Sequence, residues 1–427
     1  MSDTRFHTLP LAAGLLDNLA SLGYREMTPI QAAALPRILA GNDLVGQAKT
    51  GSGKTVAFGL GLLNKLDVKH FAVQGLVLCP TRELADQVAR ELRKLARGVH
   101  NVKILTLCGG MPFGPQVGSL AHGAHIIVGT PGRIHDHLRK RNLKLNSVHT
   151  LVLDEADRML EMGFQETLDA IVAEVPANRQ SLLFSATYPE QIQQIARRVM
   201  RDPALLNIAE QHERSSIDQR FYAVADNDAR ADAVARLLLD RRPDSAVVFC
   251  NTRRDTEELA ATLREYRLNV IALHGELDQR ARDQALVCFA NHSASVLVAT
   301  DVAARGLDIE DLSMVINYHL ARDAEVHTHR VGRTGRAGAS GEAASLFTGR
   351  EQQKLTRLEA EGLVLQMGEL PSPAVLAAPA YSPPMHCLQL DVGKKQKIRP
   401  GDILGAPTRE RRVDGSDVGK IHIFDEC

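Results

Sequence analysis

The sequence predicts an α/β protein with two consecutive parallel β-sheets, and three observations support this prediction. Short runs rich in Val, Ile and Leu alternate with amphipathic segments of helix length, which is the pattern of β-α-β units. The pattern stops at a polar stretch, 207–218, and then starts again. Nearly every apolar run ends in small or polar residues, as expected where ligands bind at the carboxyl ends of parallel strands.

We expect a strand at each apolar run. In the first half these runs are 43–48, 75–80, 102–109, 125–130, 150–157 and 181–187. In the second half they are 220–225, 246–252, 269–275, 295–301, 314–320 and 342–348. We therefore place the first domain at 1–208, a linker at 209–218 and the second domain at 219–368.

The rest of the chain differs in composition. Residues 369–385 hold five prolines in 17 positions, which predicts a semi-rigid tether. The segment 386–427 follows it. Between 392 and 412 there are seven Lys or Arg against two acidic residues, so this stretch is locally basic.

Composition excludes several classes of protein. The 51 Lys and Arg balance the 51 Asp and Glu, so any nucleic-acid surface must be a local patch. No apolar run approaches the roughly 18 residues of a membrane helix, and the first residues lack the pattern of a signal peptide. The six cysteines form no C-x-x-C pair, which argues against a zinc site or a disulfide framework. We expect a cytoplasmic protein.

The strongest chemical motif is AKTGSGKT at 48–55, which follows a predicted strand and opens a predicted helix. This is the setting of a phosphate-binding loop, in which backbone N–H groups approach phosphate oxygens. Lys54 would reach the β- and γ-phosphates, and the Thr55 hydroxyl would bind Mg²⁺. A simple Gly/Ser turn is the alternative. The loop comprises Ala48, Lys49, Thr50, Gly51, Ser52, Gly53, Lys54 and Thr55.

Two further motifs fit hydrolysis of a nucleotide. The apolar run 150–153 ends in Asp154, Glu155 and Asp157. Asp154 suits a metal ligand and Glu155 the activation of water, whereas Asp157 is expected to tie motifs together. In the second half, HRVGRTGR at 329–336 spaces arginines three residues apart. A solvated basic face is the usual alternative, but the second half has no phosphate loop of its own and could contribute arginines that stabilise phosphoryl charge.

Together these motifs resemble the DEAD-box ATP-dependent RNA helicases of superfamily 2, over residues 6 to about 348. The similar segments are, in family order, Phe6 with GYREMTPIQ (23–31), AKTGSGKT, PTRELA (80–85), GG (109–110), TPGR (130–133), DEAD (154–157), SAT (185–187), VVFCNTR (247–253), LHGELDQRAR (273–282), ATDVAARGLD (299–308) and HRVGRTGR. The resemblance implies two RecA-like domains flanking a cleft that closes on ATP and RNA. His319 stands where the family more often has an acid.

The resemblance also implies roles for individual residues. Phe6 would stack on adenine, Gln31 would hydrogen-bond its edge, Gly306 and Asp308 would approach the nucleotide, and Arg333 and Arg336 would act as arginine fingers. Ser185, Thr187, Asp157 and His329 would couple nucleotide state to strand separation. The expected contacts to the RNA backbone are Thr81, Arg82, Gly110, Thr130, Arg133, Thr252, Gln279, Arg282 and Thr300.

Residues 393–424 resemble the start of the RNA-binding domain of DbpA-type helicases, an α+β domain similar to an RRM. We expect a first strand at 387–392, a helix from Arg399 and a second strand at 420–424, so the domain would be only partial. A disordered basic tail is the alternative.

The implied activity is an RNA-dependent ATPase that unwinds short duplexes as a monomer. Its implied target is large-subunit ribosomal RNA during ribosome assembly. ATP with Mg²⁺ is the expected cofactor. An ATP-controlled RNA clamp shares every motif and stays open. The DEAD tetrad with a full Q motif argues against a DNA translocase.

Overall fold

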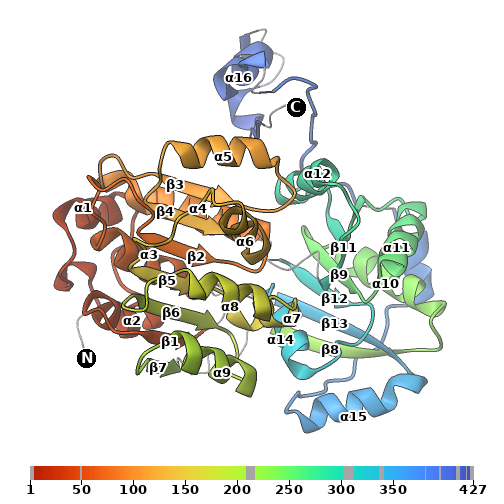
Figure 1. Ribbon diagram of the computed structural model, residues 1–427. Coiled ribbons are helices and arrows are strands. Elements are labelled where there is room, and N and C mark those ends of the chain that lie inside the picture. Colours follow the sequence, from red (N-terminus) through yellow and green to blue (C-terminus); the bar gives the residue numbers. More distant parts are fainter. Residues whose placement is uncertain are drawn as a thin grey trace. The chain divides into compact units, whose positions relative to one another are not determined.

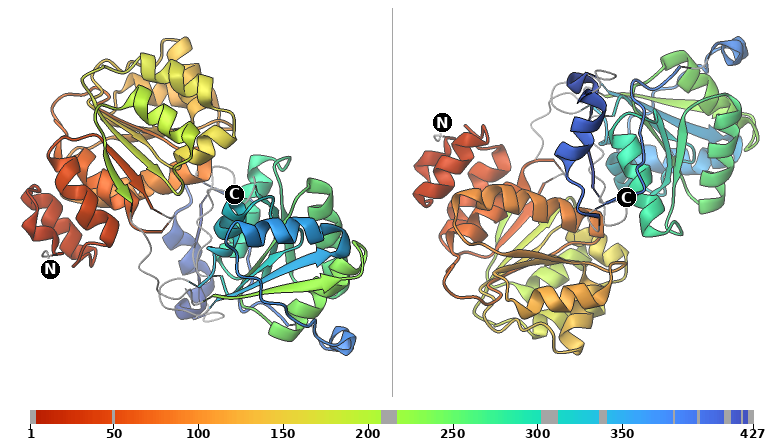
Figure 2. Two further views of the ribbon diagram at one scale, coloured as in Figure 1. Left: turned by 90° about the horizontal axis from the view of Figure 1, so that it is seen from below. Right: turned by 90° about the horizontal axis from the view of Figure 1, so that it is seen from above.

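The computed structural model describes residues 4–48, 51–207, 217–301, 312–335, 341–379, 381–393, 396–409, 414–419 and 421–423. These residues divide into two compact units, one up to Asn207 and one from Ile217 onward. Each unit has a central sheet with helices on both of its faces (Figures 1 and 2). No helix in these ranges is long and apolar enough to cross a membrane.

The first unit contains a parallel sheet with the strand order β3-β4-β2-β5-β6-β1-β7. Every apolar run predicted in the first half forms a strand: β1 Leu44–Gln47, β2 Gly75–Leu78, β3 Ile104–Leu107, β4 Ile126–Gly129, β5 Thr150–Leu153 and β6 Gln180–Ser185. The sequence did not predict β7, Ala204–Asn207, which pairs only with β1 at the edge of the sheet. An edge strand with no fully buried residue lacks the apolar signal of the others.

The strands of the first unit are apolar on both faces, so helices must cover both. Alternate residues of each strand enter two separate cores: Val152 and Leu182 point into one, and Leu151 and Leu183 into the other. The helices on the first side are α1 Ala13–Ser21, α2 Pro29–Leu39, α3 Lys54–Asn64 and α4 Arg82–Leu95. The helices on the second side are α6 Pro131–Arg139, α7 Ala156–Glu161, α8 Gln165–Ala173 and α9 Glu190–Val199, and α5 is Phe113–Ala121.

The second unit repeats this plan with the strand order β10-β11-β9-β12-β13-β8, again all parallel. Every apolar run predicted in the second half forms a strand: β8 Ile217–Val224, β9 Ala246–Cys250, β10 Val270–Leu273, β11 Val296–Thr300, β12 Met314–Asn317 and β13 Gly341–Thr348. Its helices include α10 Ala229–Arg241, α11 Arg253–Glu265, α12 Gln279–Ala290, α14 Ala324–Val331 and α15 Gln352–Ala360. Because Ile217 pairs with Gly341, β8 takes in the last two residues of the predicted linker.

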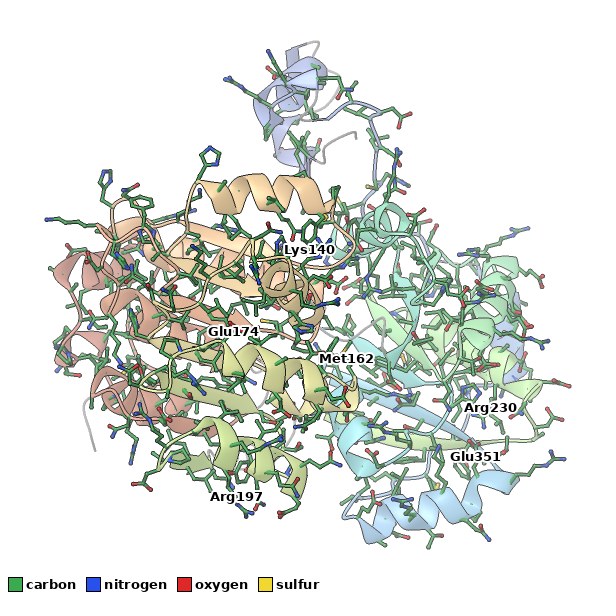
Figure 3. All side chains as sticks on the ribbon, in the orientation of Figure 1. Lys140, Met162, Glu174, Arg197, Arg230 and Glu351 are labelled. Carbon is green, nitrogen blue, oxygen red and sulfur yellow. The ribbon has the colours of Figure 1, made fainter. Side chains whose placement is uncertain are left out.

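A buried arginine ties α10 to the end of β13. Arg230 is almost fully buried, donates to the Leu346 carbonyl over 3.1 Å and forms an ion pair with Glu351. Figure 3 labels both members of this pair. An ion pair with one buried member holds its elements in register, since removing either partner leaves an uncompensated charge.

The proline-rich segment packs on the second unit. Leu370, Val375, Leu376 and Tyr381 contact the core beneath α10, and Pro373–Ala377 forms a 3₁₀ helix. The Arg236 side chain on α10 donates to the Pro371 carbonyl over 2.7 Å. The segment predicted as a tether is therefore fixed to the second unit over most of its length.

The C-terminal segment forms the predicted helix but not the predicted strands. The helix α16 spans Pro400–Arg409. Residues 387–393 and 421–423 form no strand in the described part of the chain, so the β-strands of the expected partial RRM-like fold are not observed there. A strand needs a hydrogen-bonded neighbour to be stable, and these two short stretches do not pair.

Candidate functional site

The predicted phosphate loop connects β1 to α3. Gly51 and Gly53 have φ angles of 81° and 93°, in the left-handed region that favours glycine. A Cβ atom on Gly53 would lie 2.4 Å from Gln31 Nε2, so no larger residue fits there. Lys54 opens α3, is buried, and its Nζ donates to the Ala48 carbonyl over 2.9 Å. Lys49 and Thr50 lie outside the described residues.

Of the two predicted adenine-reading residues, Gln31 contacts this loop. Gln31 forms a capping box at the start of α2: its Oε1 accepts from Thr28 N over 2.9 Å. Its Nε2 donates to the Gly53 carbonyl over 3.1 Å, and the Thr28 hydroxyl donates to the Ser52 carbonyl over 2.8 Å. Gln31 therefore holds the phosphate loop directly. Phe6 is only 3% exposed and packs edge-on against Tyr24, so stacking on adenine stays a prediction.

Asp154 and Glu155 follow β5. The strand β6 lies between β5 and β1, the strand that precedes the phosphate loop. Asp154 is 3% exposed, and its burial raises the pKa to about 6, although the Lys54 ammonium partly opposes that shift. Glu155 has a left-handed backbone, with φ 51° and ψ 52°, which is uncommon for a residue other than glycine. Its Oε2 accepts from Arg158 Nη1 over 3.0 Å in a buried ion pair.

Asp157 connects the acidic motif to the SAT motif. Its Oδ2 accepts hydrogen bonds from Ala186 N at 3.1 Å, and from Thr187 N and Thr187 Oγ1 at 3.2 Å each. Its other oxygen accepts from Arg158 N at 3.0 Å. The hydroxyl of Ser185, at the end of β6, is buried and has no hydrogen-bond partner in the described structure. The two motifs predicted to act together are therefore in direct contact.

These residues fit a nucleotide with a divalent cation. The loop offers the N-terminus of α3 to phosphate, and the Thr55 hydroxyl and Asp154 carboxylate are the hard oxygen ligands that Mg²⁺ prefers. The raised pKa of Asp154 reflects a buried carboxylate whose charge is only partly compensated, as expected where a cation belongs. A cation held by these two side chains would share its remaining coordination with phosphate oxygens and water.

The predicted RNA contacts of the first unit lie on the other half of its sheet. They follow β2, β3 and β4, which are neighbours in the order β3-β4-β2. Thr81 caps α4 by accepting from Leu84 N, and Arg82 Nη1 donates to the Gly109 carbonyl over 2.7 Å. Arg133 Nη1 donates to the Met111 carbonyl over 3.0 Å. Gly110 has a φ of 73°, and a Cβ there would collide with Arg82; Thr130 precedes α6.

The second unit repeats this grouping. Thr252 follows β9, Gln279 follows β10 and Thr300 ends β11. These three strands are adjacent in the order β10-β11-β9. The Thr252 hydroxyl caps α11, and Gln279 Nε2 donates to Asp283 Oδ1 over 2.6 Å. Arg282 lies in the first turn of α12. Each unit thus carries its predicted RNA contacts at the carboxyl ends of three neighbouring strands.

The arginines of HRVGRTGR differ in their surroundings. Arg330 is buried and forms an ion pair with Asp301, with Nε–Oδ1 at 2.6 Å and Nη2–Oδ2 at 2.7 Å. It also donates to Asn317 Oδ1 over 3.1 Å, which gives it a structural role. Arg333 follows α14 and is 7% exposed. His329 lies on α14, whereas Arg336, Gly306 and Asp308 lie outside the described residues.

Sequence reasoning missed Arg158 as part of the site, and it missed the ion pair that Arg330 of HRVGRTGR forms. Arg158 follows Glu155 by three residues on a helical turn, a spacing that brings side chains together and could have indicated the pair. The partner of Arg330 is Asp301, 29 residues earlier in the chain, and no local pattern reveals such a contact.

Comparisons with known proteins agree with this geometry. The family profile "DEAD/DEAH box helicase" matches residues 28–195, "Helicase conserved C-terminal domain" matches 229–338, and "DbpA RNA binding domain" matches 387–427. ATP-dependent RNA helicase DbpA of Escherichia coli is 53% identical over 98% of this chain and 92% of its own length. DEAD-box ATP-dependent RNA helicase CshA of Bacillus cereus is 45% identical over 83% of this chain and 68% of its own length.

Solved structures show the same fold. S. cerevisiae Dbp5 bound to RNA and ADP BeF3 is 28% identical, with a TM-score of 0.78 over 86% of this chain and 96% of that one. Mss116p bound to ssRNA and AMP-PNP is 26% identical, with a TM-score of 0.78 over 88% of this chain and 81% of that one. The two sheets are therefore tandem RecA-like domains, and the chain belongs to the DEAD-box ATP-dependent RNA helicases of the DbpA type.

Proposed function

We propose that this helicase hydrolyses ATP when it binds RNA and locally unwinds short RNA duplexes, with large-subunit ribosomal RNA in ribosome assembly as its target. The observation that carries the proposal is the division of the first sheet. The phosphate loop follows β1, the acids follow β5 and the SAT motif ends β6, whereas the predicted RNA contacts follow β2, β3 and β4. The carboxyl ends of the strands of one sheet thus offer a nucleotide site and an RNA site side by side.

In this proposal Lys54 binds the β- and γ-phosphates, and Thr55 and Asp154 hold Mg²⁺. The bound cation neutralises charge on the phosphates. Glu155 orients and activates the attacking water, and the Arg158 ion pair keeps its carboxylate in one position. The second unit supplies Arg333 and Arg336 to stabilise the transferring phosphoryl group. Phe6 and Gln31 read adenine, and Gly306 and Asp308 approach the nucleotide.

Asp157 passes the state of the nucleotide to Thr187. Its three hydrogen bonds to the SAT motif mean that a movement of the acidic loop must displace Ala186 and Thr187. The RNA contacts are hydroxyls, a glycine and arginines, which suit phosphates and 2′-hydroxyls rather than base edges. A strand held along its backbone in a bent form cannot remain in an A-form duplex, so a short duplex separates locally.

The ribosomal target is implied by the resemblance to DbpA-type helicases, and the match of residues 387–427 to the DbpA RNA binding domain supports RNA binding by this segment. The test is the rate of ATP hydrolysis by the full chain, as a monomer, across a panel of RNAs that includes large-subunit ribosomal fragments. We expect half-maximal stimulation at a lower concentration of one ribosomal fragment than of unrelated RNAs of equal length. Equal stimulation by every RNA would refute the target.

An ATP-controlled RNA clamp is the alternative, because it would use every residue named above. Strand displacement and ATP hydrolysis measured on the same duplex separate the two functions. A helicase releases the short strand at a rate that follows ATP turnover. A clamp turns over ATP, which sets its residence time on RNA, without accelerating strand release.

A further inference from the structure

The segment 385–391 lies along α12 in the second unit, running antiparallel to the helix, and Figure 1 shows the C-terminal chain passing this helix. Four contacts form a regular series, three of them on α12 and the fourth at His292, two residues beyond its end. They are Arg280 Nη2 with Asp391 Oδ1 at 3.7 Å, Gln284 Nε2 donating to Gln389 Oε1 at 2.9 Å, the thiol of Cys288 with the thiol of Cys387, and Met385 N donating to the His292 carbonyl at 3.4 Å.

The series follows from the rise of each element. Contacts recur every four residues on the helix, which is about 6 Å at about 1.5 Å per residue. They recur every two residues on the extended segment, which is about 6.6 Å at about 3.3 Å per residue. The two repeats match closely, so the contacts on either side, at Gln284 and at His292, bring Cys288 and Cys387 to the same level. The cysteine pair is thus a consequence of the register.

These two cysteines are accessible, whereas the other described cysteines are not. Cys288 is partly buried and Cys387 is exposed, while Cys79, Cys108 and Cys250 are buried. Burial raises the pKa of the Cys288 thiol to about 11, and its hydrogen bond with Cys387 adds to this shift. An oxidant therefore meets Cys387 first.

We propose that Cys288 and Cys387 form a disulfide that fastens the segment 385–391 to α12 when a small-molecule disulfide oxidant is present. The Cys387 thiol loses its proton, and the resulting thiolate attacks the oxidant RSSR to form a mixed disulfide; the released RS⁻ takes up a proton and becomes RSH. The Cys288 sulfur then displaces the second RS group, which leaves as RSH with the proton of Cys288. The two protein thiols lose two electrons and two protons in total, and the oxidant becomes two thiols.

The bond would fix the start of the C-terminal segment beside a predicted RNA-binding element. Gln279 and Arg282 lie in the first turn of α12, and the segment that Cys387 begins is the one matched by the DbpA RNA-binding domain. Reduction leaves the segment held by exposed polar contacts alone, which contribute little each. Insofar as the inference concerns RNA binding, it rests on the proposed function; the chemistry of the cysteines does not.

The test is chemical and uses the full chain with Cys427→Ser, because Cys427 lies outside the described residues. The protein is treated with glutathione disulfide at neutral pH, digested without reduction and mapped by mass spectrometry. We expect a peptide pair that joins Cys288 to Cys387 and is lighter by two hydrogens than the reduced pair. In urea the two cysteines are separated by roughly 100 residues of flexible chain, so formation should slow by at least about tenfold.

Three variants make the test specific. Cys288→Ser should leave glutathione attached at Cys387, with no cross-link. Gln284→Ala removes one exposed hydrogen bond, of about 0.5 kcal/mol, on the neighbouring turn and should slow cross-linking about twofold. Glu265→Ala on α11 is the matched control and should have no effect.

Glutathione on both cysteines without a cross-link, or equal rates in urea and in buffer, would overturn the inference. Neither result depends on ATP hydrolysis, so the proposed function and the disulfide can fail separately. If the disulfide forms, the RNA concentration for half-maximal ATPase stimulation should differ between the oxidised and reduced chain, and dithiothreitol should reverse the difference.

Discussion

Replacing Asp157 by asparagine tests how the acidic and SAT motifs communicate. The carboxylate accepts on both oxygens: one from Arg158 N and the other from Ala186 N, Thr187 N and Thr187 Oγ1. Asparagine has only one acceptor oxygen, so its NH₂ group must face a donor. The least costly orientation keeps the oxygen on the SAT side and turns the NH₂ group toward Arg158 N, which then keeps only its hydrogen bond to the Glu155 carbonyl at 3.1 Å.

The expected cost can be worked from these contacts. The lost hydrogen bond to Arg158 N costs about 0.5–1.5 kcal/mol, and the three remaining hydrogen bonds each lose the benefit of a charged acceptor, which is about 0.5–1 kcal/mol each. The sum is roughly 2–4.5 kcal/mol at this loop. Hydrogen exchange of the Ala186 and Thr187 amides should therefore accelerate about two- to fivefold each. Strand displacement per ATP hydrolysed should fall more than ATP hydrolysis itself.

The assays are amide hydrogen exchange followed by mass spectrometry, and ATPase and strand displacement on one duplex. The matched control is Asp169→Asn, which weakens a half-exposed pair with Arg198 at 3.1 Å and should change stability by less than about 0.5 kcal/mol. Unchanged exchange at Ala186 and Thr187, together with an unchanged ratio of displacement to hydrolysis, would refute the reasoning.

The remaining predictions concern single side chains. Lys54→Ala should abolish hydrolysis, whereas Glu155→Gln should abolish hydrolysis but keep ATP binding and trap RNA; near-normal turnover in Glu155→Gln would contradict its role. Arg333→Ala should lower the saturated ATPase rate by about 10³ or more, and an unchanged rate would leave it a structural residue. Gln31→Ala should weaken the preference for ATP over GTP in a competition assay. Equal use of ATP and GTP by the unmodified chain would contradict the role of Gln31 in reading adenine. The buried, neutral His327 has a pKa lowered to about 4, mainly by burial and then by the Arg330 charge. The stability that this shift contributes is complete above the pKa of the unfolded state, about 6.5, and is lost as the pH falls toward 4. Urea unfolding should therefore show up to about 3 kcal/mol of acid destabilisation that His327→Phe removes; identical pH profiles would contradict this.

The sequence predicted both sheets because their strands are short, apolar on both faces and followed by polar clusters. It missed β7, because a strand at the edge of a sheet without buried residues has no such signal. It predicted that Asp157 ties motifs together, but it did not predict that the SAT motif is the partner of Asp157. It missed the ion pair of Arg330 with Asp301, because the two residues meet only after the β-α-β units have folded.

In the C-terminal segment, the alternation of apolar and polar residues correctly predicted an extended conformation but not the element that the segment packs against. Leu388 and Leu390 alternate with polar residues, which predicts an extended conformation, and the segment lies extended along α12. Its neighbour is a helix rather than a strand. Gln389 and Asp391 contact α12, whereas Leu388 is 87% exposed and Leu390 is 46% exposed. Alternation fixes which residues share a side, but it carries no information on what that side meets.

The register of the first sheet explains why one unit can bind a nucleotide and RNA together. β2 and β5 are neighbours, and Leu78 pairs with Leu153. Asp154 follows Leu153 directly, and Thr81 comes three residues after Leu78, so the nucleotide half and the RNA half leave the sheet at the same level. A difference of one residue in this register would turn Leu76 and Leu78 into the core that now holds Val77, and Val77 into the core that now holds the two leucines, so that one core would be overfilled and the other left with a cavity. Because both cores depend on the register, the register cannot slip. The distance between the nucleotide site and the RNA site is therefore set by the packing of the sheet rather than by the loops that carry the chemistry.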